Sequence, residues 1–147
     1  LARQRNIKVL DQQLNASGAR VLANPMEVQR ILRHLVRNAD RFMSKLPEKK
    51  IDIATHILKD GRVEIIFRDY GPGVDEKVRP TIFRRQVTTK QSSKDNPEEG
   101  GGFGLLLTRL LVREMEGTIR LLPNDNNLPG ARFSIKLPVV SDASDIE

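Results

Sequence analysis

A glycine-rich run is the first group of residues in this sequence that could do chemistry. Gly100, Gly101, Gly102 and Gly104 lead directly into a predicted helix. The free backbone N–H groups and the positive dipole end of a helix start suit phosphate oxygens, and glycines let the backbone approach them closely. The run lacks the closing Gly-Lys-Ser/Thr of a Walker A loop, and it follows a polar stretch rather than the strand of a dinucleotide fold. Alone, such a run is also found in simple turns.

A carboxylate at the inner end of a strand is the second such feature. In residues 63–69, the side chains of Val63, Ile65 and Phe67 point to one face, and the alternation puts Asp69 on that same face. A buried carboxylate without a partner is costly, so it needs hydrogen-bond donors from protein, water or a ligand. The sequence therefore predicts that Asp69 belongs to a site.

A polar group beside an apolar helix stripe is the third feature. Asn24-Pro25 predicts a helix start, and the residues after it recur at three- and four-residue steps: Val28, Ile31, Leu32, Leu35, Val36, Ala39 and Phe42. Asn38 falls about 20° from Ile31 on a helical wheel, with His34 and Arg41 just beyond. These three side chains could form one wall of a cleft. A solvated helix flank is the simpler interpretation.

Composition excludes several other classes of site. The chain has no cysteine and only two histidines, His34 and His56, so disulfides are excluded and a zinc centre is not expected. Neither histidine has a nearby serine with which to form a nucleophilic pair. The formal charge of +6 suits a nucleotide triphosphate, a membrane surface or nucleic acid. Because the basic residues are scattered and aromatic residues are only 4% of the chain, we do not expect nucleic acid as a partner.

The elements that must position these residues fit one domain spanning residues 1–147. We expect strands at 7–10, 19–23, 51–58, 63–69, 118–122 and 131–137, and a second helix from Gly102 to Glu116 that ends at Gly117. The polar segment 84–101 is long for a connection, which is typical of a functional lid. Residues 1–6 are expected to end an upstream connection, and 139–147 to form a tail. No apolar run approaches the roughly 18 residues needed to cross a bilayer. The sequence starts without Met, so we interpret it as a piece of a longer protein.

Taken in order, these segments resemble the sequence boxes of the GHKL ATPases, and most closely those of sensor histidine kinases. Residues 27–42 are similar to the N box, Asp69-Tyr70-Gly71-Pro72-Gly73 to the G1 box, residues 82–90 to the F box, Gly100 to Leu105 to the G2 box, and residues 130–138 to the closing strand. Each motif alone is weak. All of them in order, over residues 5 to 138, form a specific signal.

The resemblance implies an α/β fold, a two-layer sandwich (Bergerat fold) with a mixed sheet, helices on one face and a flexible ATP lid at 84–101. It implies ATP and Mg²⁺ as ligands, with Asn38 as the metal ligand through its amide oxygen. Asp69 would accept a hydrogen bond from the adenine amino group. The other site residues implied by the resemblance are His34, Arg41, Gly71, Gly73, Thr88, Thr89, Lys90, Gly100, Gly102, Phe103, Gly104 and Leu105.

Neither histidine lies in a His-Glu-x-Arg-like acceptor motif. The implied activity is therefore that of a protein histidine kinase whose acceptor histidine lies outside this chain, on an upstream dimerisation and phosphoacceptor domain that serves a response regulator. The implied location is cytoplasmic, although many family members belong to membrane receptors.

Some positions depart from the family pattern. His34 stands where most histidine kinases have Asn and where gyrase-type relatives have a water-activating Glu. Ala131 stands where the family often has Thr, and Arg84-Arg85-Gln86 replaces a stretch that is more acidic and aromatic in the family. These departures keep an alternative open, a degenerate module that senses nucleotide or docks a partner without phosphotransfer. Another GHKL class, a mitochondrial-type kinase or a gyrase-like motor, is the third possibility, and the missing Glu speaks against the motor.

Overall fold

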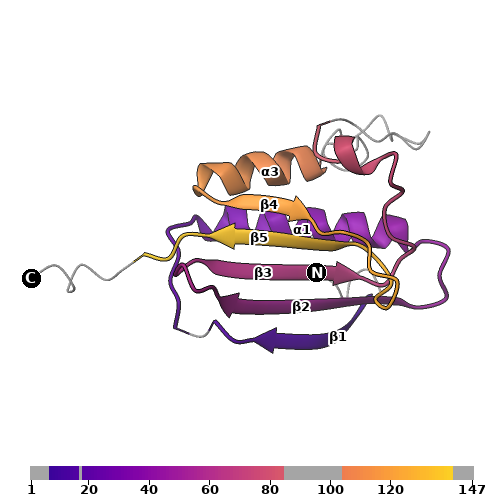
Figure 1. Cartoon of the computed structure of the whole chain (residues 1–147), viewed down its shortest axis with the longest axis horizontal. Coiled ribbons are helices and arrows are strands. Elements are labelled where there is room, and N and C mark those ends of the chain that lie inside the picture. The colour runs from indigo at the N-terminus through magenta and orange to yellow at the C-terminus, as the bar shows by residue number, and fades with distance from the viewer. Residues whose placement is uncertain (1–6, 17, 85–103, 141–147) are drawn as a thin grey trace, which may run out of the picture.

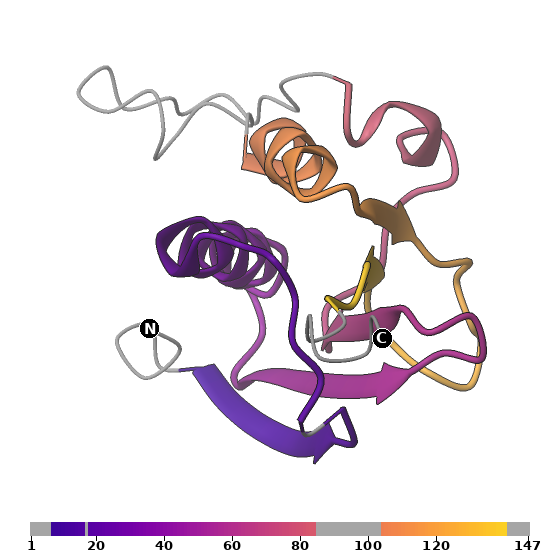
Figure 2. The same cartoon turned by 90° about the vertical axis from the view of Figure 1, so that its left-hand side faces the viewer.

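Two layers make up the structure, a computed structural model that describes residues 7–16, 18–84 and 104–140. One layer is a β-sheet and the other holds the two α-helices, which both lie on one face of the sheet (Figures 1 and 2). In chain order the elements are β1 (Ile7–Leu14), α1 (Pro25–Phe42), β2 (Lys49–Ile57), β3 (Val63–Asp69), the 3₁₀ turn η2 (Arg79–Thr81), α3 (Gly104–Glu114), β4 (Thr118–Leu121) and β5 (Arg132–Leu137).

The sheet has five strands in the order β1-β2-β3-β5-β4. β1 pairs with β2 in parallel, whereas the β2–β3, β3–β5 and β4–β5 pairs are antiparallel. The mixed sheet with helices on one face, expected from the sequence, is thereby confirmed. β3 lies in the middle of the sheet, so Asp69 at its carboxyl end is surrounded by structure on both sides.

The helix α1 begins where the sequence predicts. The Asn24 side chain accepts a hydrogen bond from the Met26 backbone N–H at 2.9 Å, and Pro25 occupies the first turn, where no N–H is needed. The apolar stripe of α1 is buried against the sheet: Ile31, Leu35, Val36 and Ala39. The helix ends at Phe42, and Met43 follows it with its side chain fully buried.

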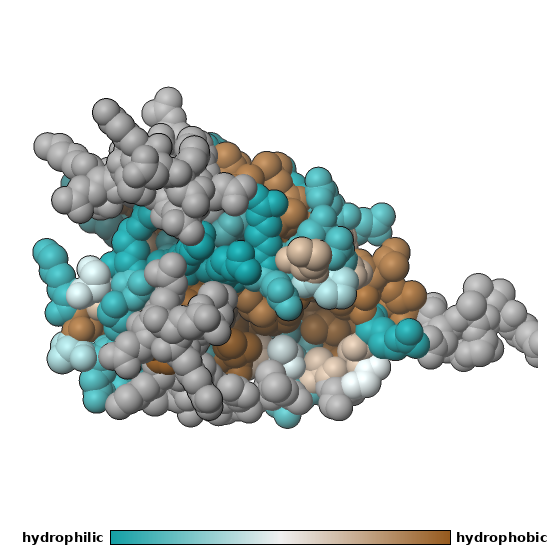
Figure 3. All heavy atoms as spheres, turned by 180° about the vertical axis from the view of Figure 1, so that it is seen from behind, coloured by the Kyte–Doolittle hydropathy of each residue, from teal (hydrophilic) through white to brown (hydrophobic). Residues whose placement is uncertain are grey.

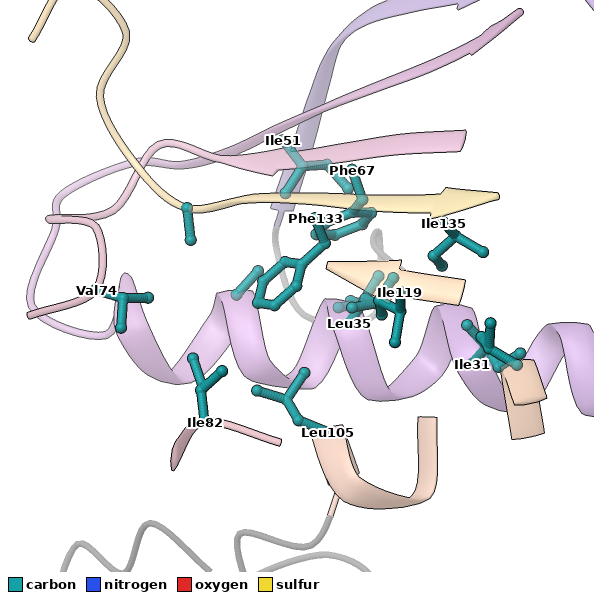
Figure 4. Packing of buried hydrophobic residues seen from close by; sticks show 14 of the residues in the cluster. Ile31, Leu35, Ile51, Phe67, Val74, Ile82, Leu105, Ile119, Phe133 and Ile135 are labelled. Carbon is teal, nitrogen blue, oxygen red and sulfur yellow. The ribbon is translucent and has the colours of Figure 1, made fainter. Parts of the chain in front are cut away.

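The core lies between the sheet and the helices. Phe67 of β3 and Phe133 of β5 are direct cross-strand partners, each 1% exposed, and the fully buried Leu35 of α1 belongs to the same cluster (Figure 4). Burying a side chain of this size stabilises the fold by about 1.5–3 kcal/mol. Because α1 carries Leu35 and Asn38 within one turn, packing of this core also fixes the position of the polar side chain.

Two details differ from the sequence-based expectation. Residues 19–23 form no strand; they connect β1 to α1, and Val21 and Ala23 pack against the core from this irregular segment. The helix α3 ends at Glu114, two residues before the predicted last residue Glu116, because Glu116 takes the left-handed conformation, with φ of 59°. The Gly117 N–H bonds to Val112 O and the Glu116 N–H to Arg113 O, which together close the helix in a Schellman motif.

Part of the outer surface of the helical layer is polar. Figure 3 shows the molecule from behind the view of Figure 1, and a band of hydrophilic residues crosses the middle of this face. On α1, Gln29, Arg33 and Arg41 are exposed. No helix in the described ranges is long and apolar enough to cross a membrane.

Gly117 is required by space, and its replacement tests this packing. A Cβ atom at Gly117 would lie 2.6 Å from both Lys136 O and a Leu137 side-chain carbon, so the strand β5 or the end of α3 would have to move. We expect Gly117→Ala to lower the free energy of unfolding by about 2–3 kcal/mol in urea titrations. The matched control is Gly61→Ala, which meets no atom within 4 Å but has φ of 86°, and it should cost only about 1 kcal/mol. Equal losses would contradict the steric explanation.

Candidate functional site

Asp69 is the most buried charged residue of the described chain, with 1% of its surface exposed. Its Oδ1 atom accepts hydrogen bonds from the backbone N–H groups of Gly71 at 2.9 Å and Ala131 at 3.1 Å. Its Oδ2 atom is buried and has no hydrogen-bond partner in the described residues. Burial raises the pKa of Asp69, an effect that the two backbone hydrogen bonds and the charge of Arg68 offset in part. The burial expected from the strand pattern is confirmed.

Two glycines allow the backbone to pack closely around this carboxylate. A Cβ at Gly71 would lie 3.0 Å from Asp69 Oδ1, and one at Gly130 would overlap the Asp69 carbonyl oxygen at 1.7 Å. Gly130 also has φ of 91°. The sequence analysis did not single out Gly130 as a site residue. Pro129-Gly130 is a turn signal, but its contact with Asp69 depends on the pairing of β3 with β5.

Asn38 and Arg41 project from the second half of α1. The Nδ2 atom of Asn38 is buried without a hydrogen-bond partner in the described part of the chain, so this amide has unmet hydrogen-bonding capacity. Arg41 is exposed. The end of α1 contacts the segment after Asp69, since a Cβ at Gly71 would lie 3.4 Å from Met43 Cγ and 3.6 Å from Phe42 Cβ. The fold thus brings the predicted N box and G1 box together.

His34 is 5% exposed, so the solvated-flank interpretation is wrong for this residue. Its Nδ1 atom lies 3.2 Å from the hydroxyl oxygen of Thr108, which is fully buried on α3. The Thr108 hydroxyl donates its proton to Gly104 O at 2.7 Å, so its oxygen must accept from His34. His34 therefore carries a proton on Nδ1, and its side chain also packs against Gly104, at 3.7 Å from a Cβ built there.

This chain of hydrogen bonds joins α1 to the first turn of α3, where the glycine-rich run ends. The sequence analysis did not identify Thr108. Its position one turn after Gly104 places it on the inner face of α3, but only the packing of the two helices reveals its partner.

The remaining predicted site residues fall into three groups. Gly73 has φ of 80°, in a turn held by Asn124, whose Nδ2 donates to Val74 O at 3.1 Å. Leu105 is 7% exposed and belongs to the core cluster, so a nucleotide contact for it stays a prediction. Six residues lie outside the described residues: Thr88, Thr89, Lys90, Gly100, Gly102 and Phe103.

A protein-family model covers most of the chain. Residues 23–141 match the model described as histidine kinase-, DNA gyrase B- and HSP90-like ATPase. This range holds Asn38, Asp69, Gly71 and Gly104, the residues whose geometry is described above. The chain belongs to this family of ATPases.

Similar proteins of known class indicate which kind of ATPase within this family the chain resembles. The chain is 28% identical over 141 residues to the sensor protein FixL of Bradyrhizobium diazoefficiens, covering 96% of this chain and 26% of FixL. It is 35% identical over 114 residues to the sensor histidine kinase CitA of Klebsiella pneumoniae, covering 76% of this chain and 19% of CitA. Among solved structures it is similar to the catalytic domain of histidine kinase ThkA, with a TM-score of 0.72, 25% identity, and coverage of 93% and 83%. The domain is thus an ATPase catalytic domain of the sensor histidine kinase class, and it spans about a quarter or less of these two curated relatives.

The buried Asp69 carboxylate makes a testable contribution to stability. Because its folded-state pKa lies above the ordinary value of 3.8, the folded protein binds this proton more tightly than the unfolded chain does. The ionised form therefore lowers the free energy of unfolding above the raised pKa, and this loss disappears as the pH falls below 3.8. We expect Asp69→Asn to raise the free energy of unfolding of the ligand-free domain by about 1 kcal/mol near neutral pH.

The difference between Asp69→Asn and wild type should shrink as denaturant titrations are repeated at lower pH, toward the ordinary pKa of a carboxyl. Asp75→Asn is the matched control, because Asp75 is exposed and its Oδ1 accepts a backbone hydrogen bond that an amide oxygen can also accept. A difference for Asp69→Asn that does not change with pH would contradict a cost of ionisation.

The hydrogen bond between His34 and Thr108 can be tested separately. We expect Thr108→Val to lower the free energy of unfolding by about 1–2 kcal/mol, because the His34 Nδ1 proton loses its buried acceptor. Thr108→Ser should retain most of the stability, and Thr118→Val, at an exposed position, should change it by less than about 0.5 kcal/mol. The ¹⁵N chemical shifts of the ring should report the Nδ1–H tautomer in wild type; the opposite tautomer would refute the assignment.

Proposed function

We propose that this domain binds ATP with Mg²⁺ and supplies the γ-phosphoryl group to a histidine side chain outside this chain. The observation that carries the proposal is the unpartnered, buried Oδ2 atom of Asp69. A buried acceptor of this kind is stable only if something donates to it, and the 6-amino group of adenine is such a donor.

The surroundings of Asp69 suit a flat base. Gly71 and Gly130 carry no side chain where a Cβ would touch the Asp69 carboxylate or carbonyl, so no side chain of these two residues would stand in the way of an approaching ring. Asp69 is held rigidly by two backbone N–H groups. A rigid acceptor discriminates between bases, because guanine has a carbonyl where adenine has its amino group, and two acceptors facing each other repel.

The phosphate end of the nucleotide would lie toward α1 and α3. Asn38 would hold Mg²⁺ through its amide oxygen, a ligand type that this hard cation prefers, and Arg41 would pair with phosphate oxygens. The ion would neutralise part of the charge on the phosphate oxygens. The backbone N–H groups at the start of α3, beginning at Gly104, would donate to the same oxygens. His34 would act as a positioning residue, through its bond to Thr108, rather than as a base.

The acceptor histidine is proposed to lie elsewhere because both histidines of this chain are already engaged. His34 is buried between the helices, and His56 Nε2 lies 2.7 Å from Glu64 Oε1. Both His56 and Glu64 point away from the helical layer, on the opposite face of the sheet from Ile51 and Phe67. An upstream dimerisation and phosphoacceptor domain of the same protein, with a response regulator as the final recipient, remains the partner that we propose.

Calorimetric titration with a non-hydrolysable ATP analogue tests the nucleotide site. We expect saturable binding, at least tenfold weaker binding of the matching GTP analogue, and loss of that preference in Asp69→Asn. Asn38→Ala should remove the enhancement by Mg²⁺ but keep the base preference. The control Asp75→Asn should bind as wild type does. No binding by a folded domain would overturn the proposal, whereas binding without phosphorylation of the full-length parent protein would favour a nucleotide-sensing module.

A further inference from the structure

A groove of about 550 Å³ lies between η2, the second half of α3 and β4. None of the described residues assigned to the nucleotide site lines it. Its lining includes four arginines and no acidic residue of the described chain: Arg79, Arg109, Arg113 and Arg120. The groove is therefore a positively charged feature whose described lining is separate from the residues of the proposed ATP site.

Three of the four arginines are not neutralised by the described protein. Arg79 is used internally, because it donates to Leu122 O at 2.6 Å and to Asn124 Oδ1 at 3.1 Å. Arg109, Arg113 and Arg120 have no ion pair or hydrogen bond with any described residue. Arg109 and Arg113 are four residues apart on α3, so they share one helix face. Like charges held close together repel, and an anion bound in the groove would remove that repulsion.

The groove is also apolar and is bounded by β4. Its apolar lining comes from Pro80, Phe83, Ile119 and Leu121. β4 is an edge strand of the sheet, and the Leu122 N–H bonds to Arg132 O, toward β5. Because backbone groups alternate in direction along an antiparallel strand, those of Ile119 and Leu121 face away from β5. Arg79 donates a hydrogen bond to Leu121 O at 3.4 Å, and Ile119 is only 8% exposed, so β4 forms a wall of the groove and not an open strand edge.

We propose that this groove docks an extended, acidic polypeptide segment of a partner protein beside β4. Its carboxylates would pair with Arg109, Arg113 and Arg120, and its apolar side chains would contact the apolar lining. An inorganic anion would leave the apolar lining unused. Nucleic acid would need several aromatic faces on which its bases could stack, whereas Phe83 is the only aromatic residue in the described lining of the groove.

Fluorescence anisotropy on the full 147-residue chain tests the proposal with a labelled synthetic peptide in which Glu alternates with Ala around a single Phe. We expect saturable binding that persists with the ATP analogue present and weakens as salt is added. The double variant Arg113→Ala/Arg120→Ala should weaken binding on the order of tenfold. Both side chains are exposed, so this variant should fold, which thermal melts will check.

The matched control is Arg33→Ala/Lys59→Ala, which removes the same charge from exposed positions away from the groove. It should leave peptide binding unchanged. Equal weakening by the two double variants would overturn the proposal, because it would show non-specific charge attraction. Displacement of the peptide by the ATP analogue, or tighter binding of inorganic polyphosphate or single-stranded DNA than of the peptide, would overturn it as well.

Discussion

The buried carboxylate of Asp69 is the constraint on which the rest of the site depends. One of its oxygens binds the backbone N–H groups of Gly71 and Ala131, residues that are 60 positions apart in sequence. This single acceptor fixes the loop after β3 against the start of β5. The second oxygen has no partner in the described residues, so this carboxylate, which connects two distant segments, still has unmet hydrogen-bonding capacity. Under the proposed function, the side chain that organises this part of the fold would also recognise the ligand.

The helices α1 and α3 connect the Asp69 region to the start of α3. The end of α1 packs on Gly71, and one face of α1 also carries Asn38 and His34. His34 reaches Thr108 on α3, and Thr108 in turn bonds Gly104 at the start of that helix. Asp69 and the start of α3 are thus joined through α1. Under the proposed function, this path would keep the base end and the phosphate end of the nucleotide site at a constant separation.

Arginines at the surface of the chain lie in two different places. Arg41 lies exposed beside the proposed phosphate site, where it can act on a nucleotide. Arg109, Arg113 and Arg120 lie around a groove on the far side of α3, where no nucleotide residue is found. The basic residues behind the net charge of +6 therefore lie in at least two separate places on the domain. Under the two proposals, α3 would have one side toward the nucleotide and another toward the docked partner.

The sequence by itself determined the local elements and the residue types of the site. The 3.6-residue period and the Asn24-Pro25 cap defined α1, and the two-residue alternation of β3 put Asp69 on the buried face, because both signals arise from neighbouring residues. Only the tertiary structure decided which distant residues meet. Gly130 touches Asp69 across the β3–β5 pairing, and His34 is buried by Thr108, 74 positions away. The apolar residues of 19–23 predicted a strand, yet they pack as an irregular connection, because burial alone does not require pairing in a sheet.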